Sequence, residues 1–289
     1  MHIRPAFALA DTTQIGTVAL KVADLAKMSQ FYQAIIGLHL IKETDTTAIL
    51  GVGQRPLLIL NQVHTPLAKS QKTGLYHTAF LLPTRAALGD ALLHYLTIKA
   101  PLIGASDHGY SEALYLGDPE GNGIEVYRDK PTSEWDIRED GEIVGTSLEL
   151  DAQAVVDSAT RQWSGFPEGT TVGHIHLQVS DLNETQTFYT DVLGLSLKNN
   201  FGAQAKFFAT GAYHHHVGAN TWNGQGLPPM TTNDLGLDYY TFNTKTYMEL
   251  KRIESHFVAD SIPFTKENDG TLWMTDPSGI RVKFEIEPE

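Results

Sequence analysis

Cysteine is absent from this chain of 289 residues, which excludes disulfides, thiolate metal ligands and a cysteine nucleophile. The chain also lacks any run of about 18 apolar residues, the length that a membrane-spanning helix requires. Its first residues, MHIRPAFALADTT, are too short and too broken a stretch for a signal peptide. We therefore expect a cytoplasmic protein.

Positive charge is scarce, because 21 lysines and arginines stand against 34 aspartates and glutamates, for a net charge of −13. This balance argues against nucleic acid and against anionic membrane surfaces as partners. The hydrophobic content of 42% and the charged content of 19% are typical of a globular protein rather than a disordered one. The length allows one large domain or two ordinary ones.

An internal repeat is the main organising feature of the chain. The segment IGTVALKVADLAKMSQFYQAIIGL aligns without a gap with VGHIHLQVSDLNETQTFYTDVLGL, at an offset of 157 residues. Further along, GLYHTAF recurs as GLDYYTF, and LYLGDPEGNGIEV recurs as LWMTDPSGIRV, two residues shorter. The repeat predicts a first domain over residues 14–128, a polar linker over 129–171 and a second domain over 172–287.

Each domain divides again into two similar units. GTVALKV has the alternation and the β-branched residues of a strand, Asp24 can cap the helix that follows, and Gly37 can end it. Strand-like TAILGVG and RPLLILN come next, and the later segments YHTAFLLP, RAALGDALLHYLTIKA, EALYLGDP and GIEVYRD repeat this order. The sequence therefore predicts an α+β protein of four βαβββ modules, numbered here 1 to 4 along the chain.

Three polar residues in the predicted strands are candidate metal ligands. His77 lies in the first strand of module 2, His174 lies in the first strand of module 3, and Glu125 lies in the last strand of module 2. Each residue alone is compatible with an ordinary core or surface position, but the matching positions favour a shared site. Two neutral imidazoles and one carboxylate suit Fe(II), and they also suit Mn(II), or Zn(II) with water.

The tandem βαβββ pattern resembles the vicinal oxygen chelate superfamily, which includes glyoxalase I, fosfomycin-resistance proteins and extradiol ring-cleaving dioxygenases. The resemblance covers nearly the whole chain except the linker, and it implies mixed, curved sheets that form metal-binding cups. Within the superfamily the chain looks most like the catechol 2,3-dioxygenase type found in Firmicutes, whose second half also carries GHIH and YHHH segments.

One stretch, DHGYSEALYLGDPEGNGIEVY, looks like the extradiol dioxygenase signature. The residues that match it are His108, Leu114, Tyr115, Asp118, Pro119, Gly121 and Glu125. In the family the glutamate binds iron, and the tyrosine and the histidine contact the substrate. The chain departs from the family layout, in which the second domain holds all three ligands, because here the signature lies in the first domain.

The distribution of ligands predicts which modules share a site. Modules 2 and 3 together supply all three candidate ligands, whereas modules 1 and 2 lack one, because Thr17 stands where His174 stands. Modules 1 and 4 offer Thr17, Tyr239 and Arg281, which bind iron poorly because arginine stays protonated and free tyrosine has a pKa of about 10. We expect one site between modules 2 and 3 and a second cup without metal. The alternative is a metal held weakly by modules 1 and 2 with an extra water.

The resemblance also implies a histidine in the last strand of module 3 that steadies bound oxygen and donates a proton. If strand alternation holds, His214 and His216 face the cup, and we expect His216 to take this role, with His214 and His215 as the alternatives. His176, on the same face as His174, is the alternative ligand. The candidate pocket walls, which could equally be core aromatics, are Tyr76, Tyr127 and Trp222.

The activity we expect is oxygen-dependent extradiol cleavage of catechol or a substituted catechol with Fe(II). As the resemblance implies, Tyr115 would steer the substrate oxygen, His108 would close over the substrate, and His216 would handle the proton. Two other classes stay open, a glyoxalase-like lyase or isomerase that uses Zn(II) or Ni(II), and a metal-free protein that binds small molecules. Dependence on O2 and metal analysis separate the three. A homo-oligomer is compatible with the sequence.

Overall fold

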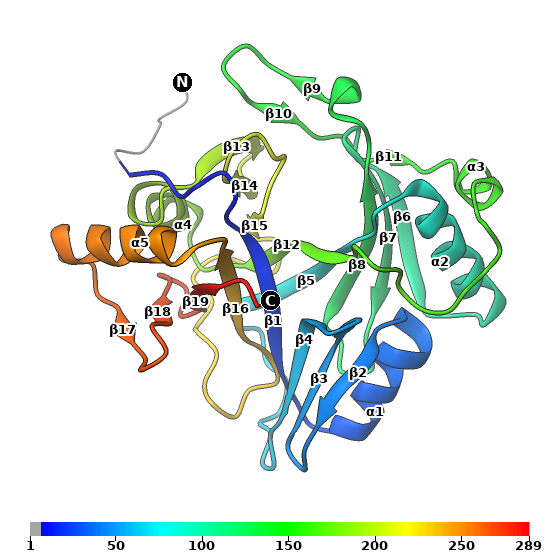
Figure 1. The fold of residues 1–289 in the computed structure, drawn as a ribbon, viewed down its shortest axis with the longest axis horizontal. Helices are drawn as coiled ribbons and strands as arrows, with labels where there is room; N and C mark the ends of the chain where they lie inside the picture. The colour runs from blue at the N-terminus through cyan, green and yellow to red at the C-terminus, as the bar shows by residue number, and fades with distance from the viewer. Residues whose placement is uncertain (1–6, 289) are drawn as a thin grey trace.

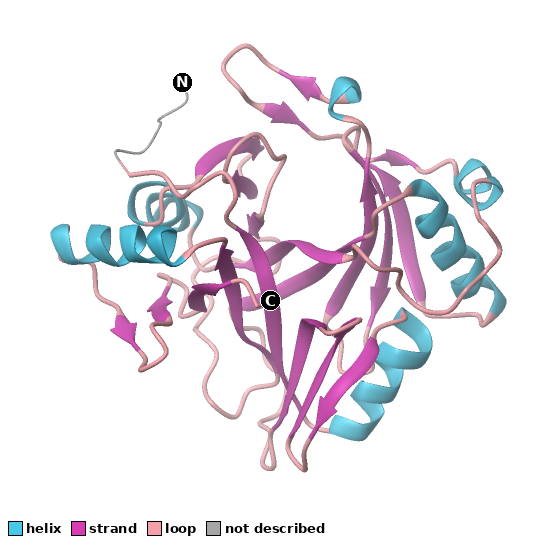
Figure 2. Ribbon diagram, viewed as in Figure 1, coloured by secondary structure: helices cyan, strands magenta, loops and turns pink. Residues whose placement is uncertain are grey.

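The computed structural model describes residues 7–288. It confirms four modules, each a strand, a helix and three strands (Figures 1 and 2). Module 1 consists of β1 (Gln14–Val22), α1 (Leu25–Phe31), β2 (His39–Glu43), β3 (Thr47–Val52) and β4 (Arg55–Gln62). Module 2 consists of β5 (Gly74–Leu81), α2 (Arg85–Thr97), β6 (Leu102–Asp107), β7 (Ser111–Gly117) and β8 (Gly123–Asp129).

The second half of the chain repeats this order. Module 3 consists of β12 (Thr171–Gln178), α4 (Leu182–Thr187), β13 (Ser196–Phe201), β14 (Ala205–Ala209) and β15 (Val217–Asn220). Module 4 consists of β16 (Gly236–Thr244), α5 (Tyr247–Ala259), β17 (Thr265–Lys266), β18 (Leu272–Thr275) and β19 (Arg281–Ile286). The fold is therefore α+β, as the sequence predicts.

Each of the two large sheets combines one module from each half of the chain. The eight-stranded sheet has the order β17-β18-β19-β16-β1-β4-β3-β2, so modules 4 and 1 lie side by side. The nine-stranded sheet has the order β11-β6-β7-β8-β5-β12-β15-β14-β13, so module 2 lies beside module 3. The modules join through antiparallel pairs, β1 with β16 and β5 with β12. The expected pairing of modules 2 and 3 is confirmed.

The segment between the halves has its own structure. It contains η2 (Thr132–Glu134), β9 (Asp136–Ile137), β10 (Ile143–Val144), β11 (Leu148–Glu149) and α3 (Ala152–Asp157). β9 and β10 form a hairpin, while β11 extends the edge of the nine-stranded sheet beyond β6. In Figure 1 this sheet curves into a U, and the hairpin lies over its open side. The segment therefore covers the sheet as well as connecting the halves.

The helix of module 1 begins after Asp24 and its continuation ends at Gly37, as the sequence predicts, and the helix of module 3 begins in the same way. Asp24 accepts a hydrogen bond from the backbone of Lys27, and Asp181 caps α4 in the same way. Such caps satisfy the free N–H groups of the first turn. Each helix continues into one π-helical turn, η1 (Tyr32–Ile36) and η3 (Phe188–Val192). Gly37 ends the first with a φ of 105°, a conformation that glycine adopts without strain.

The repeated Phe-Tyr pair links consecutive modules. The Tyr32 hydroxyl donates to Asp118 at 3.0 Å, and the Tyr189 hydroxyl donates to Asp276 at 3.4 Å. Each aspartate belongs to the Asp-Pro turn of the next module, where it also accepts backbone N–H groups. These buried contacts give a structural reason for the repeat of both motifs, because buried hydroxyls and carboxylates need partners.

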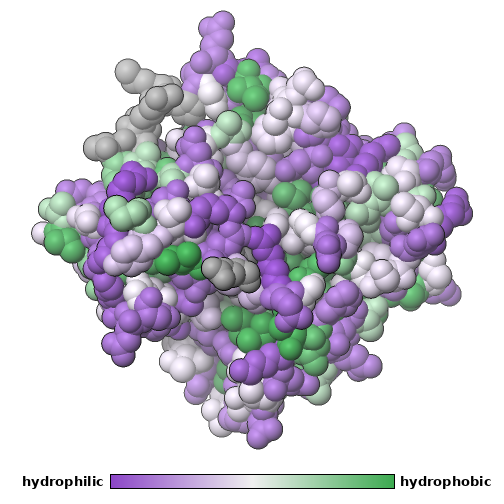
Figure 3. Space-filling view, viewed as in Figure 1, coloured by the Kyte–Doolittle hydropathy of each residue, from purple (hydrophilic) through white to green (hydrophobic). Residues whose placement is uncertain are grey.

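The surface agrees with the composition. Hydrophilic side chains dominate the face in Figure 3, as a net charge of −13 predicts, and the largest hydrophobic group visible there lies beside the C-terminus. No helix in residues 7–288 is long and apolar enough to cross a membrane.

Candidate metal centre

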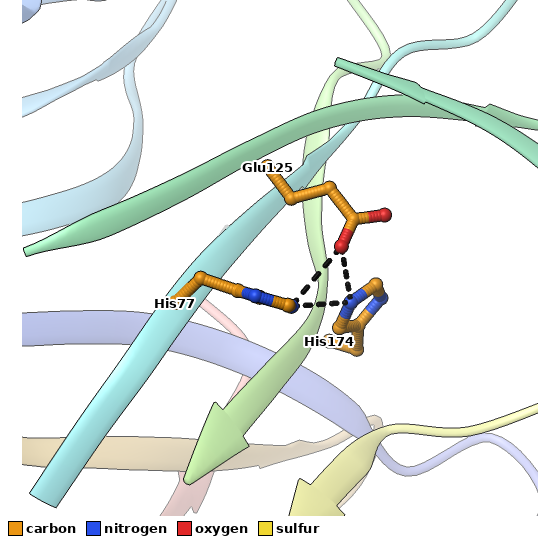
Figure 4. A group of neighbouring side chains, drawn as sticks. All are labelled: His77, Glu125 and His174. Atoms are coloured by element: carbon orange, nitrogen blue, oxygen red, sulfur yellow. Dashed lines mark hydrogen bonds and ion pairs between the residues drawn. The ribbon is translucent and has the colours of Figure 1, made fainter. Parts of the chain in front are cut away.

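Three adjacent strands of the nine-stranded sheet bring the predicted ligands together. Ala79 on β5 lies opposite Glu125 on β8 and also opposite His174 on β12. His77 precedes Ala79 by two residues, so its side chain emerges on the same face of the sheet. Ala79 is fully buried, and its small methyl group leaves room for the side chains of His77, Glu125 and His174, which point toward one another (Figure 4).

The alternation of side chains along β12 shows that the candidate ligands lie on the concave face of the sheet. Ile175 and Leu177 belong to the hydrophobic core, so His174 and His176 point to the opposite, concave face of the sheet. His77 and His174 come from different halves of the chain, yet their strands are direct neighbours. The site therefore exists only because the nine-stranded sheet joins modules 2 and 3.

The three side chains converge on one point. Oε2 of Glu125 lies 3.0 Å from Nε2 of His77 and 3.3 Å from Nε2 of His174, and the two nitrogens are 3.3 Å apart (Figure 4). Two atoms that bind one ion at about 2.1 Å and at right angles to each other are about 3.0 Å apart. The separations therefore fit three ligands on one face of a divalent metal, and the donor set is that of a 2-His-1-carboxylate site.

The protonation states also suit a metal. Burial lowers the pKa of His174 to about 4, which keeps its imidazole neutral. Burial alone would raise the pKa of Glu125, but the imidazoles of His174 and His77 outweigh it and hold the pKa well below its usual range. A neutral imidazole and an ionised carboxylate are the forms that bind a metal. All three side chains are buried.

A cavity of about 300 Å³ opens directly in front of the three ligands, all of which line it. The volume is at the lower end of the range for small-molecule sites. A neighbouring cavity of about 470 Å³ touches His77 but neither Glu125 nor His174. The two cavities share Tyr76, His77 and Tyr115. The smaller cavity is therefore the one in which a bound molecule would reach the metal centre.

His108 and Tyr115 of the predicted signature meet in this cavity. Nδ1 of His108 lies 2.7 Å from the backbone carbonyl of Thr146 and must donate to it, which leaves Nε2 of a neutral ring as an acceptor. The Tyr115 hydroxyl, 2.5 Å from this Nε2, is then the donor. Burial raises the pKa of Tyr115 well above its usual range, so the phenol keeps its proton. The structure thus places both side chains in the cavity that the three candidate ligands line.

The prediction for the YHHH segment was wrong in its choice of residue. His215, not His216, lines the cavity, and its ring centroid is 4.1 Å from that of His174. Nδ1 of His216 instead accepts a hydrogen bond from the backbone N–H of Thr210. Strand alternation does not extend to these histidines, because β15 begins only at Val217 and the chain bends before it.

The predicted aromatic walls divide into two groups. Tyr76 and Trp222 line the cavity, with ring centroids 4.9 Å apart. His176 lines it as well, and its ring contacts those of Tyr76, Trp222 and His77. Tyr127 lies on the same face of β8 as Glu125, with its ring centroid 4.9 Å from that of His174, but it is fully buried and its hydroxyl contacts that of Tyr213 at 2.8 Å. Tyr127 is therefore a packing residue rather than a wall of the cavity.

The segment between the halves supplies part of the wall, which the sequence analysis missed. Gly145, Thr146 and Ser147 line the cavity, and the carbonyl of Thr146 fixes His108. Asn199 on β13 ties the β9–β10 hairpin to the sheet by donating to the carbonyl of Ile143 at 3.2 Å. The segment is long and polar, and the sequence analysis treated it as a linker because no motif within it indicated a site.

The second cup, between modules 1 and 4, differs from the prediction in one residue. Tyr239 occupies the position of His77. On β19 the residue opposite Tyr239 is Arg281, and on β8 the residue opposite His77 is Gly123, so Arg281 is equivalent to Gly123. Lys283 therefore occupies the position of Glu125, and Arg281 does not. The two Asp-Pro turns have the same length and the same backbone hydrogen bonds, so the two-residue gap in the sequence alignment was wrong.

The corrected position leads to the same conclusion about metal binding in this cup. Lys283 carries a positive charge where the metal centre has a carboxylate, and it pairs with Glu285 at 2.6 Å. Arg281 packs over the Trp273 ring at 4.4 Å and pairs with Asp238. Among residues 7–288, the only group of three candidate ligands that converge is His77, Glu125 and His174.

Comparison with known proteins defines the class. The model of the Glyoxalase/Bleomycin resistance protein/Dioxygenase superfamily matches residues 14–126 and 171–284, and the chain belongs to this superfamily. The chain is also similar to the catechol-2,3-dioxygenase of Bacillus subtilis (strain 168), with 41% identity over 282 residues that cover 96% of this chain and 98% of that protein. It is 29% identical to biphenyl-2,3-diol 1,2-dioxygenase 3 of Rhodococcus globerulus over 125 residues, which are 41% of this chain and 64% of that protein.

Solved structures share the fold. A Bacillus subtilis protein described as a dioxygenase superposes with a TM-score of 0.63 at 13% identity, over 97% of this chain and 87% of that one. Glyoxalase I from Zea mays superposes with a TM-score of 0.55 at 12% identity, over 95% and 92% of the two chains. At these identities the structures support the architecture and do not distinguish between lyase and dioxygenase chemistry.

Proposed function

We propose that this protein is an extradiol ring-cleaving dioxygenase that acts on catechol or a substituted catechol with Fe(II) and O2. The observation that carries the proposal is the buried, convergent group of His77, Glu125 and His174 at one wall of a small aromatic cavity. The activity named for the Bacillus subtilis relative, at 41% identity over nearly the whole chain, supports the same reaction.

Fe(II) at this centre would supply coordination positions for the catechol oxygens and for O2. The residues of the chain position the substrate. Tyr115 presents its phenol beside Glu125, which lies opposite it on β8, and His108 fixes the orientation of that phenol. His215 faces the cavity next to His174 and takes over the proton-handling role that we expected of His216.

The cavity walls favour a neutral substrate. Besides the imidazoles and Glu125, the side chains that line the cavity in the described part of the chain are aromatic or uncharged and polar, and none belongs to lysine or arginine. A carboxylate on the catechol ring would enter without a counter-ion, and a buried unpaired charge is costly. We therefore expect kcat/KM for catechol to exceed that for a carboxylated catechol by at least about tenfold, an energy difference of about 1.4 kcal/mol.

The test is anaerobic reconstitution with Fe(II), followed by addition of catechol and then of O2. The proposal expects consumption of one O2 per catechol and a visible absorbance from the ring-cleaved product. Protein loaded with Zn(II) is the control, because Zn(II) has no redox chemistry. A loaded protein that consumes no O2 with any simple catechol would refute the proposal. Conversion of a substrate without O2 would favour the glyoxalase-like alternative.

A further inference from the structure

We propose that Asp129 and His214 are positioning residues that set the tautomer of His215, so that its Nε2 presents a lone pair to the cavity. The tautomer follows from hydrogen bonds within the protein alone. Only its use, to accept a hydrogen bond from a substrate hydroxyl, rests on the function proposed above.

A chain of two hydrogen bonds joins the three side chains. Oδ1 of Asp129 lies 2.9 Å from Nε2 of His214, and Nδ1 of His214 lies 2.7 Å from Nδ1 of His215. His214 and His215 are both buried, whereas the Asp129 side chain is 23% exposed. The chain therefore runs from the cavity wall to a carboxylate at the surface.

The carboxylate decides the direction of both bonds. An ionised Asp129 can only accept, so Nε2 of His214 must carry the proton between them. A His214 ring that carries a single proton then has a bare Nδ1, which can only accept, and the proton of the second bond must sit on Nδ1 of His215. This leaves Nε2 of neutral His215 without a proton. Burial, together with the neighbouring His174 and His214, lowers the pKa of His215 well below its usual range, in keeping with a neutral ring.

Aromatic packing holds the middle of the chain in place. The His214 ring stacks on Tyr110 with centroids 4.2 Å apart and an interplanar angle of 12°, and the edge of Trp135 packs against it at 5.3 Å. Trp135 comes from the segment between the halves, which also supplies part of the cavity wall. A rotation of the His214 ring would have to displace these neighbours, so the orientation of both hydrogen bonds is fixed by packing.

The proposed tautomer has a clear consequence for binding. A bare Nε2 on His215 accepts a hydrogen bond from a catechol hydroxyl, whereas the other tautomer would present an N–H to the same place. Because His215 and the predicted metal ligand His174 are in contact, the accepted hydroxyl would be one that lies near the metal. Asp129 and His214 thus act on the substrate only through His215.

The decisive variant is Asp129→Asn, which keeps the shape but allows the side chain to donate. If the Asn amide donates to Nε2 of His214, the proton of His214 moves to Nδ1, which then donates to Nδ1 of His215, and Nε2 of His215 gains the proton. Nitrogen-15 NMR of histidine-labelled, metal-free protein reads out both tautomers. The parent should show a protonated Nδ1 and a bare Nε2 on His215, and Asp129→Asn should reverse them.

Two further variants complete the test. Asp129→Glu retains an acceptor and should keep the parent tautomer. Glu287→Gln is the matched control, because Glu287 occupies the position of Asp129 in module 4 and pairs with Arg55 and Lys245 instead of a histidine. In the Fe(II)-loaded enzyme, Asp129→Asn should lower kcat by on the order of 10²-fold, the effect of losing one preorganised polar contact, while the metal content stays at the parent level.

A parent protein with the proton on Nε2 of His215 would overturn the inference without any variant. An Asp129→Asn protein in which Nε2 of His214 has lost its proton while His215 keeps the parent tautomer would overturn it as well. Both measurements use metal-free protein without substrate, so they stand apart from the proposed function. An inactive parent with the expected tautomer would refute the dioxygenase reaction and leave the hydrogen-bonded chain intact.

Discussion

Replacing His174 by alanine should abolish metal binding, although His174 lies in the other half of the chain from His77 and Glu125. The change removes one of three convergent ligand atoms and leaves two, which are 3.0 Å apart. A buried site with two protein ligands holds a divalent ion weakly, because catalytic metal sites use at least three. The stability that the metal adds to the fold measures this loss directly.

The size of the effect can be worked out from the length of the chain. A metal present at 100 times its Kd stabilises the folded state by about 2.7 kcal/mol. The unfolding entropy of 289 residues is about 0.6 kcal/mol per degree, so Tm should rise by about 4 °C. Loss of a group that merely supports a ligand costs 10- to 100-fold in affinity, so loss of a ligand should cost at least about 100-fold. The same metal concentration would then raise the Tm of the variant by less than about 1 °C.

The assay is thermal unfolding with and without Mn(II), which avoids the oxidation of Fe(II). Thr17→Ala is the matched control, because Thr17 occupies the position of His174 in the second cup, and its metal-induced shift should equal that of the parent. A His174→Ala protein that keeps the full shift would refute a site shared between modules 2 and 3. A Thr17→Ala protein that loses the shift would mean that the metal binds in the other cup.

Three further outcomes are expected. Ala79→Leu should reduce metal content, measured by atomic absorption, to near zero, because Ala79 lies opposite both Glu125 and His174 and a larger side chain fills the space between them; full occupancy would contradict this geometry. Tyr115→Phe should slow ring cleavage by on the order of 10²-fold with metal content unchanged, and an unchanged rate would remove Tyr115 from the reaction. Burial raises the pKa of Asp276 to about 7, so the folded state favours the protonated form and the parent should lose stability between about pH 4 and pH 7. Asp276→Asn should abolish this loss. Urea unfolding at pH 5 and pH 8 tests it, and a variant that loses as much stability as the parent would contradict it.

The convergence of the three candidate ligands could be predicted from the sequence because the internal repeat allowed equivalent positions to be compared. His174 stood out only by comparison with Thr17, and the match between His77 and His174 related two strands that later proved to be neighbours. The pairing of modules followed from chemistry, because only modules 2 and 3 together offered two imidazoles and a carboxylate. The pairing could be predicted without knowing how the modules pack, because histidine and glutamate differ clearly from the apolar residues that fill a core.

The errors arose where backbone geometry departed from the regular pattern. The choice of His216 assumed an extended strand, but the chain bends ahead of Val217 and brings His215 to the cavity. The choice of Arg281 assumed a shorter turn, whereas the hydrogen bonds of the two turns show equal length and place Lys283 at the position. A bend and a turn are set by local backbone hydrogen bonds, which residue types alone specify weakly at these points.

The joining of the two halves in both sheets has a consequence for how the chain acquires its structure. Val18 on β1 pairs with Tyr240 on β16, more than 200 residues later in the sequence, so β1 cannot complete its pairing until module 4 has been made. Contacts this distant slow folding, because a long loop must close before they form. Each half of the chain contributes one module to each sheet, so each cup contains one module from each half. In such an arrangement one cup can present two imidazoles and a carboxylate while the other holds a threonine, a tyrosine and a lysine at the same positions.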